Sequence, residues 1–280
     1  MQTTQERQPP IRDQAARRWI EQHQFGAFVG LAYLISWAWW IPLSLGADRV
    51  EAGVGWPTQI PGLMGPMLAA IAVTWLIDGR GGVGAQWRKV TAWRAGRWWL
   101  SVPAVLVLGA AGMLASSDSI QSEDLVAYQG VSYDLGALVT ILIVFVCNGL
   151  GEEAGWRGFA ADRLLNRHSL TATSLIVASV WAPWHIPVFF LQESFRAFTA
   201  VEVAGWVLGI TAGSIVLTWL YRGSRRSILL VSVWHTAFNF TSATPAAAGV
   251  AAAISSTGVM VLAVLILILD IRKTRGASAD

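Results

Sequence analysis

The feature that most limits how this chain can fold is a series of eight apolar segments, each about as long as a membrane-spanning helix. They cover residues 25–45, 59–77, 97–115, 135–151, 170–191, 202–221, 227–244 and 250–270, and the fourth extends further as a helix. A helix needs about 20 apolar residues to cross the hydrocarbon layer of a bilayer. Backbone groups in lipid find partners only within a helix or a closed barrel. The pattern therefore predicts an all-α, polytopic membrane protein with about eight transmembrane helices.

Composition supports this prediction. Hydrophobic residues make up 54% of the chain and charged residues only 13%, against about a quarter charged in a soluble domain. The 16 tryptophans suit the two membrane interfaces, where one edge of an indole ring is wet. The basic residues fall in short clusters between apolar segments, so we expect membrane lipids and no nucleic acid as partners. The single Cys147 excludes an internal disulfide.

The domain organisation follows from the same segments. Residues 1–24 hold no apolar signal sequence and predict a cytosolic, partly disordered N-terminal tail. Residues 25–271 predict one eight-helix domain, and residues 272–280 a cytosolic C-terminal tail. Within the domain, tryptophan and basic residues alternate over 78–97, which predicts an amphipathic helix on the membrane surface.

The distribution of basic residues predicts the orientation. If both termini are cytosolic, 18 of the 20 Lys and Arg residues lie on the cytosolic side. The opposite loop 116–134 carries Asp118, Glu123, Asp124 and Asp134 without a base. This division follows the positive-inside rule. With short loops and no targeting element, we expect a multi-pass protein of a bacterial cell membrane.

A few ionisable or amide side chains interrupt the apolar segments. Such groups cost about 2.5–3.5 kcal/mol each at the helix centre, and they commonly mark function. Glu152 and Glu153 follow the fourth segment, His185 lies in the fifth, and His235 and Asn239 lie in the seventh. Taken singly, each can be a packing residue that another polar group satisfies.

Counting residues from the predicted turns brings these groups to one depth. Glu152 and His185 lie 16 to 17 residues on either side of a turn near residue 168, which places them level on antiparallel helices. His235 lies nine residues beyond Arg226, at a depth of roughly 13 Å. We therefore expect one polar layer shared by three helices.

Helical spacing predicts the local pairs. Glu153 and Arg157 are an i, i+4 pair, which favours a salt bridge outside this polar layer. Glu152 points about 100° away around the helix and is predicted to face the histidines. Pro183 and Pro187 flank His185 and predict a kink with carbonyls left for water or substrate.

In order and spacing, these residues resemble the three-motif signature of the CPBP intramembrane proteases, which include CAAX prenyl proteases and bacteriocin-processing proteins. The motifs here are Glu152-Glu153-x-x-x-Arg157, an aromatic-x-x-x-His185 and His235-x-x-x-Asn239. The segment GPMLAA in the second helix is also similar, so the resemblance covers most of residues 59–245. Trp181 stands where phenylalanine is commonest, and the two are interpreted as equivalent apolar packing residues.

The resemblance implies a hydrolase that cuts peptide bonds within the membrane. Glu152 and His185 would activate water, His235 and Asn239 would stabilise the oxyanion, and Glu153 and Arg157 would support the site. Family members are also called metalloproteases, and Glu152, His185 and His235 can supply ligands to a divalent metal such as zinc. The sequence has no HExxH motif, so metal-dependent and metal-free mechanisms both stay open.

Three functions remain at this stage. A protease would act on a prenylated CAAX peptide, another peptide or a membrane protein. A non-catalytic scaffold or regulator of the same fold is the main alternative. A transporter or proton relay also uses intramembrane carboxylates and histidines, but the two halves of the chain share no pattern. Nothing in the sequence determines the oligomeric state.

Overall fold

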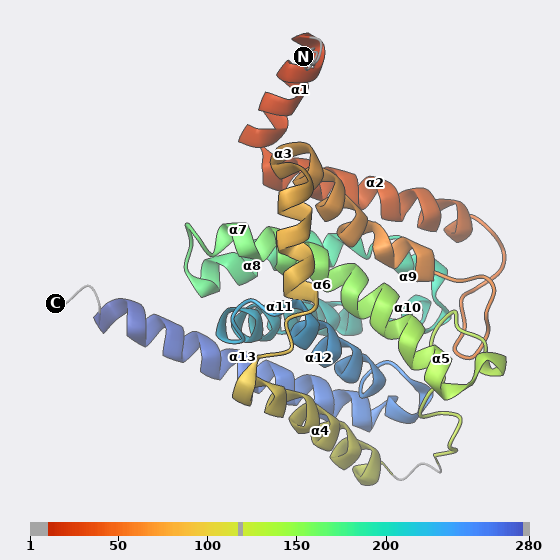
Figure 1. Ribbon diagram of the computed structural model, residues 1–280. Helices are drawn as coiled ribbons and strands as arrows, with labels where there is room; N and C mark the ends of the chain where they lie inside the picture. Colours follow the sequence, from red (N-terminus) through yellow and green to blue (C-terminus); the bar gives the residue numbers. More distant parts are fainter. Residues whose placement is uncertain (1–10, 117–119, 277–280) are drawn as a thin grey trace.

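The structure is a computed structural model that describes residues 11–116 and 120–276, and in this part of the chain the regular structure is helical apart from isolated β-bridges (Figure 1). The α-helices are α1 Ile11–Gln22, α2 Gln24–Ser44, α3 Gly65–Val90, α4 Ser101–Ala115, α5 Gly136–Ile143, α6 Gly151–Gly155, α7 Asp162–Leu164, α8 Leu170–Trp184, α9 Val188–Leu191, α10 Glu193–Arg196, α11 Ala200–Gly223, α12 Ile228–Phe240 and α13 Val250–Gly276. Short 3₁₀ segments are η1 Ile60–Met64, η2 Gly96–Leu100, η3 Tyr133–Leu135 and η6 Pro245–Ala247, while η4 Val144–Leu150 and η5 Trp156–Ala161 are π-helical.

The prediction of an all-α polytopic membrane protein is confirmed. Seven helices of the described chain are long and apolar enough to cross a membrane, and α12 is a shorter apolar helix. At 1.5 Å per residue, the 13 residues of α12 extend about 20 Å, less than the 30 Å of hydrocarbon. Because most of its side chains are buried in the bundle, α12 is surrounded by protein and needs no full apolar span.

The predicted surface helix over 78–97 takes a different form. Residues up to Val90 continue helix α3, which bends at Gly79, where φ is +63°. Figure 1 shows the two halves of α3 pointing in different directions. Glycine tolerates this left-handed conformation, which an L side chain rarely adopts. The helical backbone is interrupted at Gly79, so α3 consists of two helices that meet there, and the chain turns as it leaves the second apolar span.

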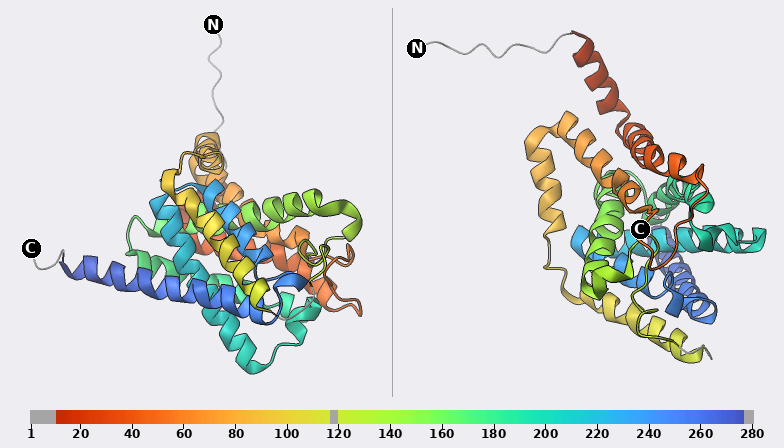
Figure 2. Two further views of the ribbon diagram at one scale, coloured as in Figure 1. Left: turned by 90° about the horizontal axis from the view of Figure 1, so that it is seen from below. Right: turned by 90° about the vertical axis from the view of Figure 1, so that its right-hand side faces the viewer.

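The described part of the N-terminal tail is also helical, where the sequence predicted partial disorder. Helix α1 is joined almost directly to α2, and Arg17 pairs with Glu21 one turn later at 2.9 Å. Figures 1 and 2 show α1 and the end of α13 projecting from the bundle. Residues 1–10, Asp118 and residues 277–280 lie outside the described residues.

Helix α6 lies within the bundle and packs against both α3 and α12. Small residues make this close approach sterically feasible. A Cβ on Gly155 would lie 2.5 Å from Pro66, and one on Gly149 would lie 2.8 Å from the Ser232 carbonyl. Helices pack closely in membranes where such small residues meet. Both carboxylates of α6 are consequently enclosed by protein.

Two loops and a helix end meet at the side of the bundle that the sequence places outside the cytosol. Ala52 bridges Gln129, and Val50 bridges Gln192. The Gly53 amide donates to the carbonyl of Tyr128 at 3.1 Å. These bonds hold the loop before η3 against the bundle and orient Tyr128 towards its centre.

Candidate active site

One helical rod carries both carboxylates of the candidate site. Helices η4, α6 and η5 follow one another without a break, so two π-helical stretches flank Glu152 and Glu153. Short π-helical insertions are frequent at functional sites because they re-aim side chains within a helix. The exposed fraction is 1% for Glu152 and 0% for Glu153, so neither carboxylate faces lipid.

Glu152 accepts one N–H on each of its carboxylate oxygens. The indole Nε1 of Trp181 donates to Oε2 at 2.7 Å, and the side-chain amide of Asn148 donates to Oε1. Hydrogen bonds to an ionised group are roughly twice as strong as neutral ones. The two donors come from different helices, so they hold the carboxylate in one orientation while lone pairs on both oxygens remain free.

Glu153 also belongs to this cluster, and the prediction that it lies outside the polar layer is wrong. Its Oε1 accepts from Arg157 Nη1 at 2.9 Å, as the spacing predicted, and also from His235 Nδ1 at 2.8 Å. The reason is packing: α6 contacts α12 as well as α3, and His235 of α12 reaches Glu153. His235 thus pairs with the second carboxylate.

The contact with Glu153 sets the protonation of the His235 ring. A carboxylate can only accept, so Nδ1 of His235 carries a proton. A neutral ring then presents Nε2 as an acceptor, and Nε2 becomes a donor only when the ring is doubly protonated. The same reasoning applies to His185, whose Nδ1 lies 2.9 Å from the carbonyl oxygen of Trp181.

His185 lies at the C-terminal end of α8, where the helix stops between two prolines. Its ring is half-buried and packs edge-on against Trp184 and Trp206, with ring centroids 4.7 and 5.2 Å away. The sequence predicted that this break leaves carbonyls for water or substrate, but a protein side chain uses the one at Trp184. The Trp184 carbonyl accepts from the indole of Trp37 at 2.9 Å.

Asn239 reaches the cluster through a second amide. Its side-chain Nδ2 donates to Asn148 Oδ1, which also accepts from the hydroxyl of Tyr128 at 3.1 Å. Asn148 in turn donates to Glu152. A hydrogen-bonded chain thus runs from Tyr128 in the loop through Asn148 to the buried carboxylate, and Asn239 of α12 joins it at Asn148. One N–H of Asn239 is left for another acceptor.

Arg157 is fully buried, with an exposed fraction of 0%. Its guanidinium carbon lies 4.3 Å from the centre of a Trp181 ring, a distance at which a cation is attracted to the ring face. Its Nε and Nη2 atoms find no partner among the described residues. The pair with Glu153 is the salt bridge recorded for this charge.

Sequence reasoning missed three members of the cluster: Trp181, Asn148 and Tyr128. Trp181 was interpreted as equivalent to phenylalanine, but its indole N–H donates to Glu152 and its rings touch His185 and His235. Asn148 offered a signal, since an amide one turn before Glu152 in an apolar run needs a partner. Tyr128 lies in a loop, and no periodicity connects it to the site.

The predicted metal ligands do not converge. Within residues 11–116 and 120–276, no group of three or more His, Cys, Asp or Glu side chains is arranged to hold a metal ion. Glu152, His185 and His235 are therefore not grouped to hold a metal ion in this arrangement, and we derive no step through a metal.

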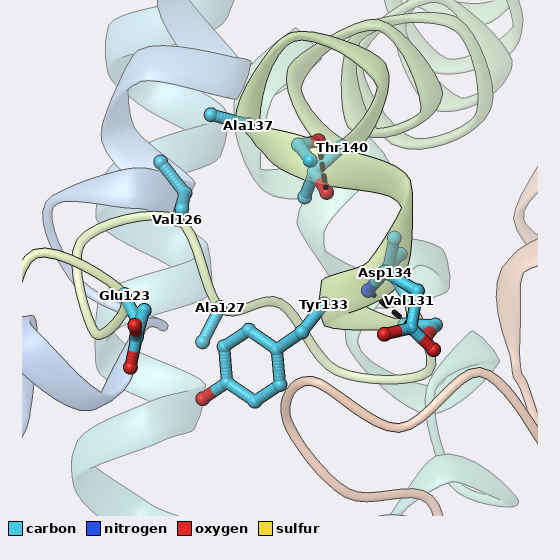
Figure 3. Close-up of a pocket in the computed structure, with 10 residues that line it drawn as sticks. Glu123, Val126, Ala127, Val131, Tyr133, Asp134, Ala137 and Thr140 are labelled. Carbon is cyan, nitrogen blue, oxygen red and sulfur yellow. Dashed lines mark hydrogen bonds between the residues drawn. The ribbon is translucent and has the colours of Figure 1, made fainter.

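A cavity of about 420 Å³ lies near the loop that carries Tyr128, and Figure 3 shows its lining. Ala127 and Val131, on either side of Tyr128, line it together with Tyr133 and Asp134. None of the predicted site residues faces this cavity. The cluster around Glu152 is thus separate from this hollow, and its half-buried members are His185 and Asn239.

Comparison with known proteins connects the cluster to a family. Residues 134–241 match the family described as type II CAAX prenyl endopeptidase, Rce1-like, and this range contains all three motifs. A curated relative from Methanococcus maripaludis, named CAAX prenyl protease 2, is 29% identical over 145 residues. That alignment covers 50% of this chain and 52% of the relative, so the chain spans about half the length of the relative it matches. Residues 134–241, which carry the cluster, are thus similar to the Rce1-like family of type II CAAX prenyl endopeptidases, and this similarity confirms the resemblance of the three motifs.

Proposed function

We propose that this protein is an intramembrane endopeptidase that hydrolyses a peptide bond near the cytosolic interface. The observation that carries the proposal is the environment of Glu152. Its carboxylate is 1% exposed, and an N–H from each of two helices orients it next to Trp181, whose rings lie 6.0 and 5.7 Å from those of His185 and His235. The family match at residues 134–241 supports the same reaction class.

In this mechanism Glu152 is the general base. Its carboxylate takes one proton from a water molecule, and the resulting hydroxide attacks the carbonyl carbon of the scissile bond. The His185 ring lies 6.0 Å from that of Trp181. Its Nε2 carries no proton when Nδ1 does, and it holds the water as a hydrogen-bond acceptor. Protonated Glu152 then returns the proton to the leaving amine, so no proton is gained or lost.

Asn239 and His235 supply the oxyanion site. Asn239 has one side-chain N–H left after its bond to Asn148, and this N–H donates to the developing oxyanion. His235 donates from Nε2 only as an imidazolium, and Glu153 beside Nδ1 balances that charge. Single donors of this kind are commonly worth about 2.7–4 kcal/mol in the transition state.

The substrate is proposed to be a membrane-anchored peptide. The curated relative is named a CAAX prenyl protease, which favours a peptide with a prenylated cysteine near its C-terminus. A non-prenylated membrane peptide is the second candidate, because short loops without a targeting element are expected of a bacterial protein, which would process peptides or membrane proteins.

The test is cleavage of paired reporter peptides by purified protein in lipid nanodiscs. One peptide carries a prenyl group, and its twin has the same sequence without it. Glu152→Gln keeps the shape of the side chain but cannot accept the proton from water, so turnover should fall about 10²–10⁴-fold at an unchanged melting temperature. Glu193→Gln, at an exposed carboxylate, is the matched control and should keep full turnover.

The other outcomes identify the alternatives. A well-folded wild type that cuts neither peptide supports the scaffold function, and ion or solute flux in proteoliposomes supports the transporter. Near-normal turnover by Glu152→Gln, together with a folded but inactive Glu153→Gln, would show that the second carboxylate is the base.

A further inference from the structure

A second cavity lies at the end of the bundle opposite the Tyr128 loop. It has a volume of about 480 Å³ and is lined by residues of two separate segments. One segment is the stretch 93–99 that leads into α4, and the other is the turn between α11 and α12, at Gly223 and Arg225. Cavities of about 300–1,000 Å³ are the usual size for small-ligand sites.

The lining of this cavity is cationic. Arg94, Arg97 and Arg225 contribute to it, and no acidic residue does. Within residues 11–116 and 120–276, no carboxylate is recorded in an ion pair with any of the three. The neighbouring arginines differ, because Arg222 pairs with Asp270 and Arg226 with Asp162. The cavity therefore holds three positive charges without an internal counter-charge.

Contacts within the protein hold the residues that line the cavity in place. Ser227 Oγ donates to the carbonyl of Ala92, which joins the two segments. The ring of Trp98 lies against the backbone of Gly223 so closely that a Cβ there would be 2.1 Å from the ring. Trp99 Nε1 donates to the Trp93 carbonyl at 2.7 Å. A preformed site loses little conformational freedom when it binds.

The backbone at Arg225 is unusual for a residue with a long side chain. Its φ is +60° and that of Arg226 is +62°, in the left-handed region that favours glycine. Such conformations cluster at binding and catalytic sites. The two arginine side chains have different surroundings. Arg226 binds Asp162 and Asn166 within the protein, whereas Arg225 is exposed and lines the cavity.

The position of the cavity identifies the ligand class. Two candidate membrane spans, Gly96–Ala115 and Ala200–Gly223, begin and end at its lining, so it lies where helices leave the hydrocarbon. Trp93 is 66% exposed there, and exposed indoles favour the headgroup level. The ligand that fills this layer and complements three arginines is the phosphodiester of a lipid, and basic pockets at helix ends commonly bind anionic headgroups.

We propose that Arg94, Arg97 and Arg225 form a binding site for the headgroup of an anionic phospholipid. The guanidinium groups bind the phosphate oxygens in the planar, forked geometry that arginine offers, while the tryptophan rings contact the glycerol and the upper acyl chains. This site is separate from the cluster around Glu152 and does not depend on peptidase activity.

The test is retention of lipid by the purified full-length protein, measured by native mass spectrometry. The protein is titrated in neutral detergent with phosphatidylglycerol or with phosphatidylcholine of the same acyl chains. We expect the wild type to retain phosphatidylglycerol selectively. At about fivefold per arginine near the membrane surface, the triple variant Arg94→Gln/Arg97→Gln/Arg225→Gln should bind on the order of 10²-fold more weakly.

A matched triple variant removes the same charge elsewhere on this side of the bundle. Arg80, Arg88 and Arg167 are exposed and lie outside the cavity, and their replacement by Gln should weaken phosphatidylglycerol binding by less than about fivefold in total. Equal loss in both triple variants, or equal retention of phosphatidylcholine by the wild type, would overturn the site. Binding of inorganic phosphate without retention of phosphatidylglycerol would also overturn it.

A single variant keeps the proposal testable if the triple variant does not fold. Arg225→Gly should raise the melting temperature, because glycine tolerates the left-handed backbone, while it weakens phosphatidylglycerol binding about fivefold. An arginine with a purely structural role would lower the melting temperature when removed. Unchanged lipid binding in Arg225→Gly would refute its place in the site.

Discussion

The structure contains two i, i+4 arginine–glutamate pairs of the same length in opposite environments, and they allow a controlled test of burial. Arg157 pairs with Glu153 at 2.9 Å with both side chains 0% exposed. Arg17 pairs with Glu21 at 2.9 Å with exposed fractions of 57% and 39%. Removing one partner of a buried pair leaves an uncompensated charge and costs about 3–5 kcal/mol. An exposed pair contributes about 0–1 kcal/mol.

We therefore expect Arg157→Met to lower the melting temperature by about 6–20 °C, at about 2–4 °C per kcal/mol for a chain of this size. Arg17→Met should change it by less than about 4 °C. The assay is thermal unfolding of purified protein in one detergent, followed by loss of helical circular dichroism. Folded yield should fall in parallel for Arg157→Met alone.

The double variant Glu153→Gln/Arg157→Met separates burial of charge from loss of packing. Because it removes both charges, it should recover at least half of the stability lost in Arg157→Met. If Arg157→Met were as stable as Arg17→Met, Glu153 would have to be neutralised or solvated in another way, and the argument from burial would be wrong. If Arg157→Met kept its stability but lost all turnover, Arg157 would belong to the catalytic set.

Three further expectations follow from the cluster and the topology. Trp181→Phe keeps an aromatic ring against Arg157 but removes the donor to Glu152, so kcat should fall about tenfold or more at unchanged KM; an equal kcat would return Trp181 to a packing role. Asn148→Ala should lower turnover while the melting temperature of the same samples changes little, because it breaks the hydrogen bonds that join Tyr128 and Asn239 to Glu152. A large drop in melting temperature with little loss of turnover would give these hydrogen bonds a structural role. Cysteine labelling from outside the cell should reach Gln121→Cys but not a cysteine in the turn 222–226, and labelling of both would overturn the predicted orientation.

The membrane spans could be predicted from the sequence because their cause is local. A backbone in lipid must satisfy its hydrogen bonds within its own helix, so the length and apolarity of a segment are sufficient. The predicted segments 170–191 and 202–221, for example, correspond to the spans Leu170–Leu191 and Ala200–Gly223. The bend of α3 was not predictable in the same way, since a single Gly79 in a basic, aromatic stretch is compatible with either a turn or a separate surface helix.

The membership of the polar cluster was predictable only in part. Spacing along one helix predicted the Arg157–Glu153 pair, because side chains at i and i+4 are adjacent on any helix. It could not show which carboxylate meets His235, because the relative angle of two side chains says nothing about the rotation of α6 within the bundle. Packing against α3 and α12 decides that rotation.

The apolar helices, their order, the family motifs and the residue types proposed for hydrolysis could thus be recognised from the sequence. The side-chain partners became visible only in the folded bundle: Glu153 with His235, Glu152 with the indole of Trp181, and Tyr128 with Asn148. The physical reason is the distance along the sequence over which the interacting groups are separated. Helix formation in lipid depends on a residue and its near neighbours, whereas each of these contacts joins side chains 20 to 82 positions apart, and close packing of the whole bundle brings them together.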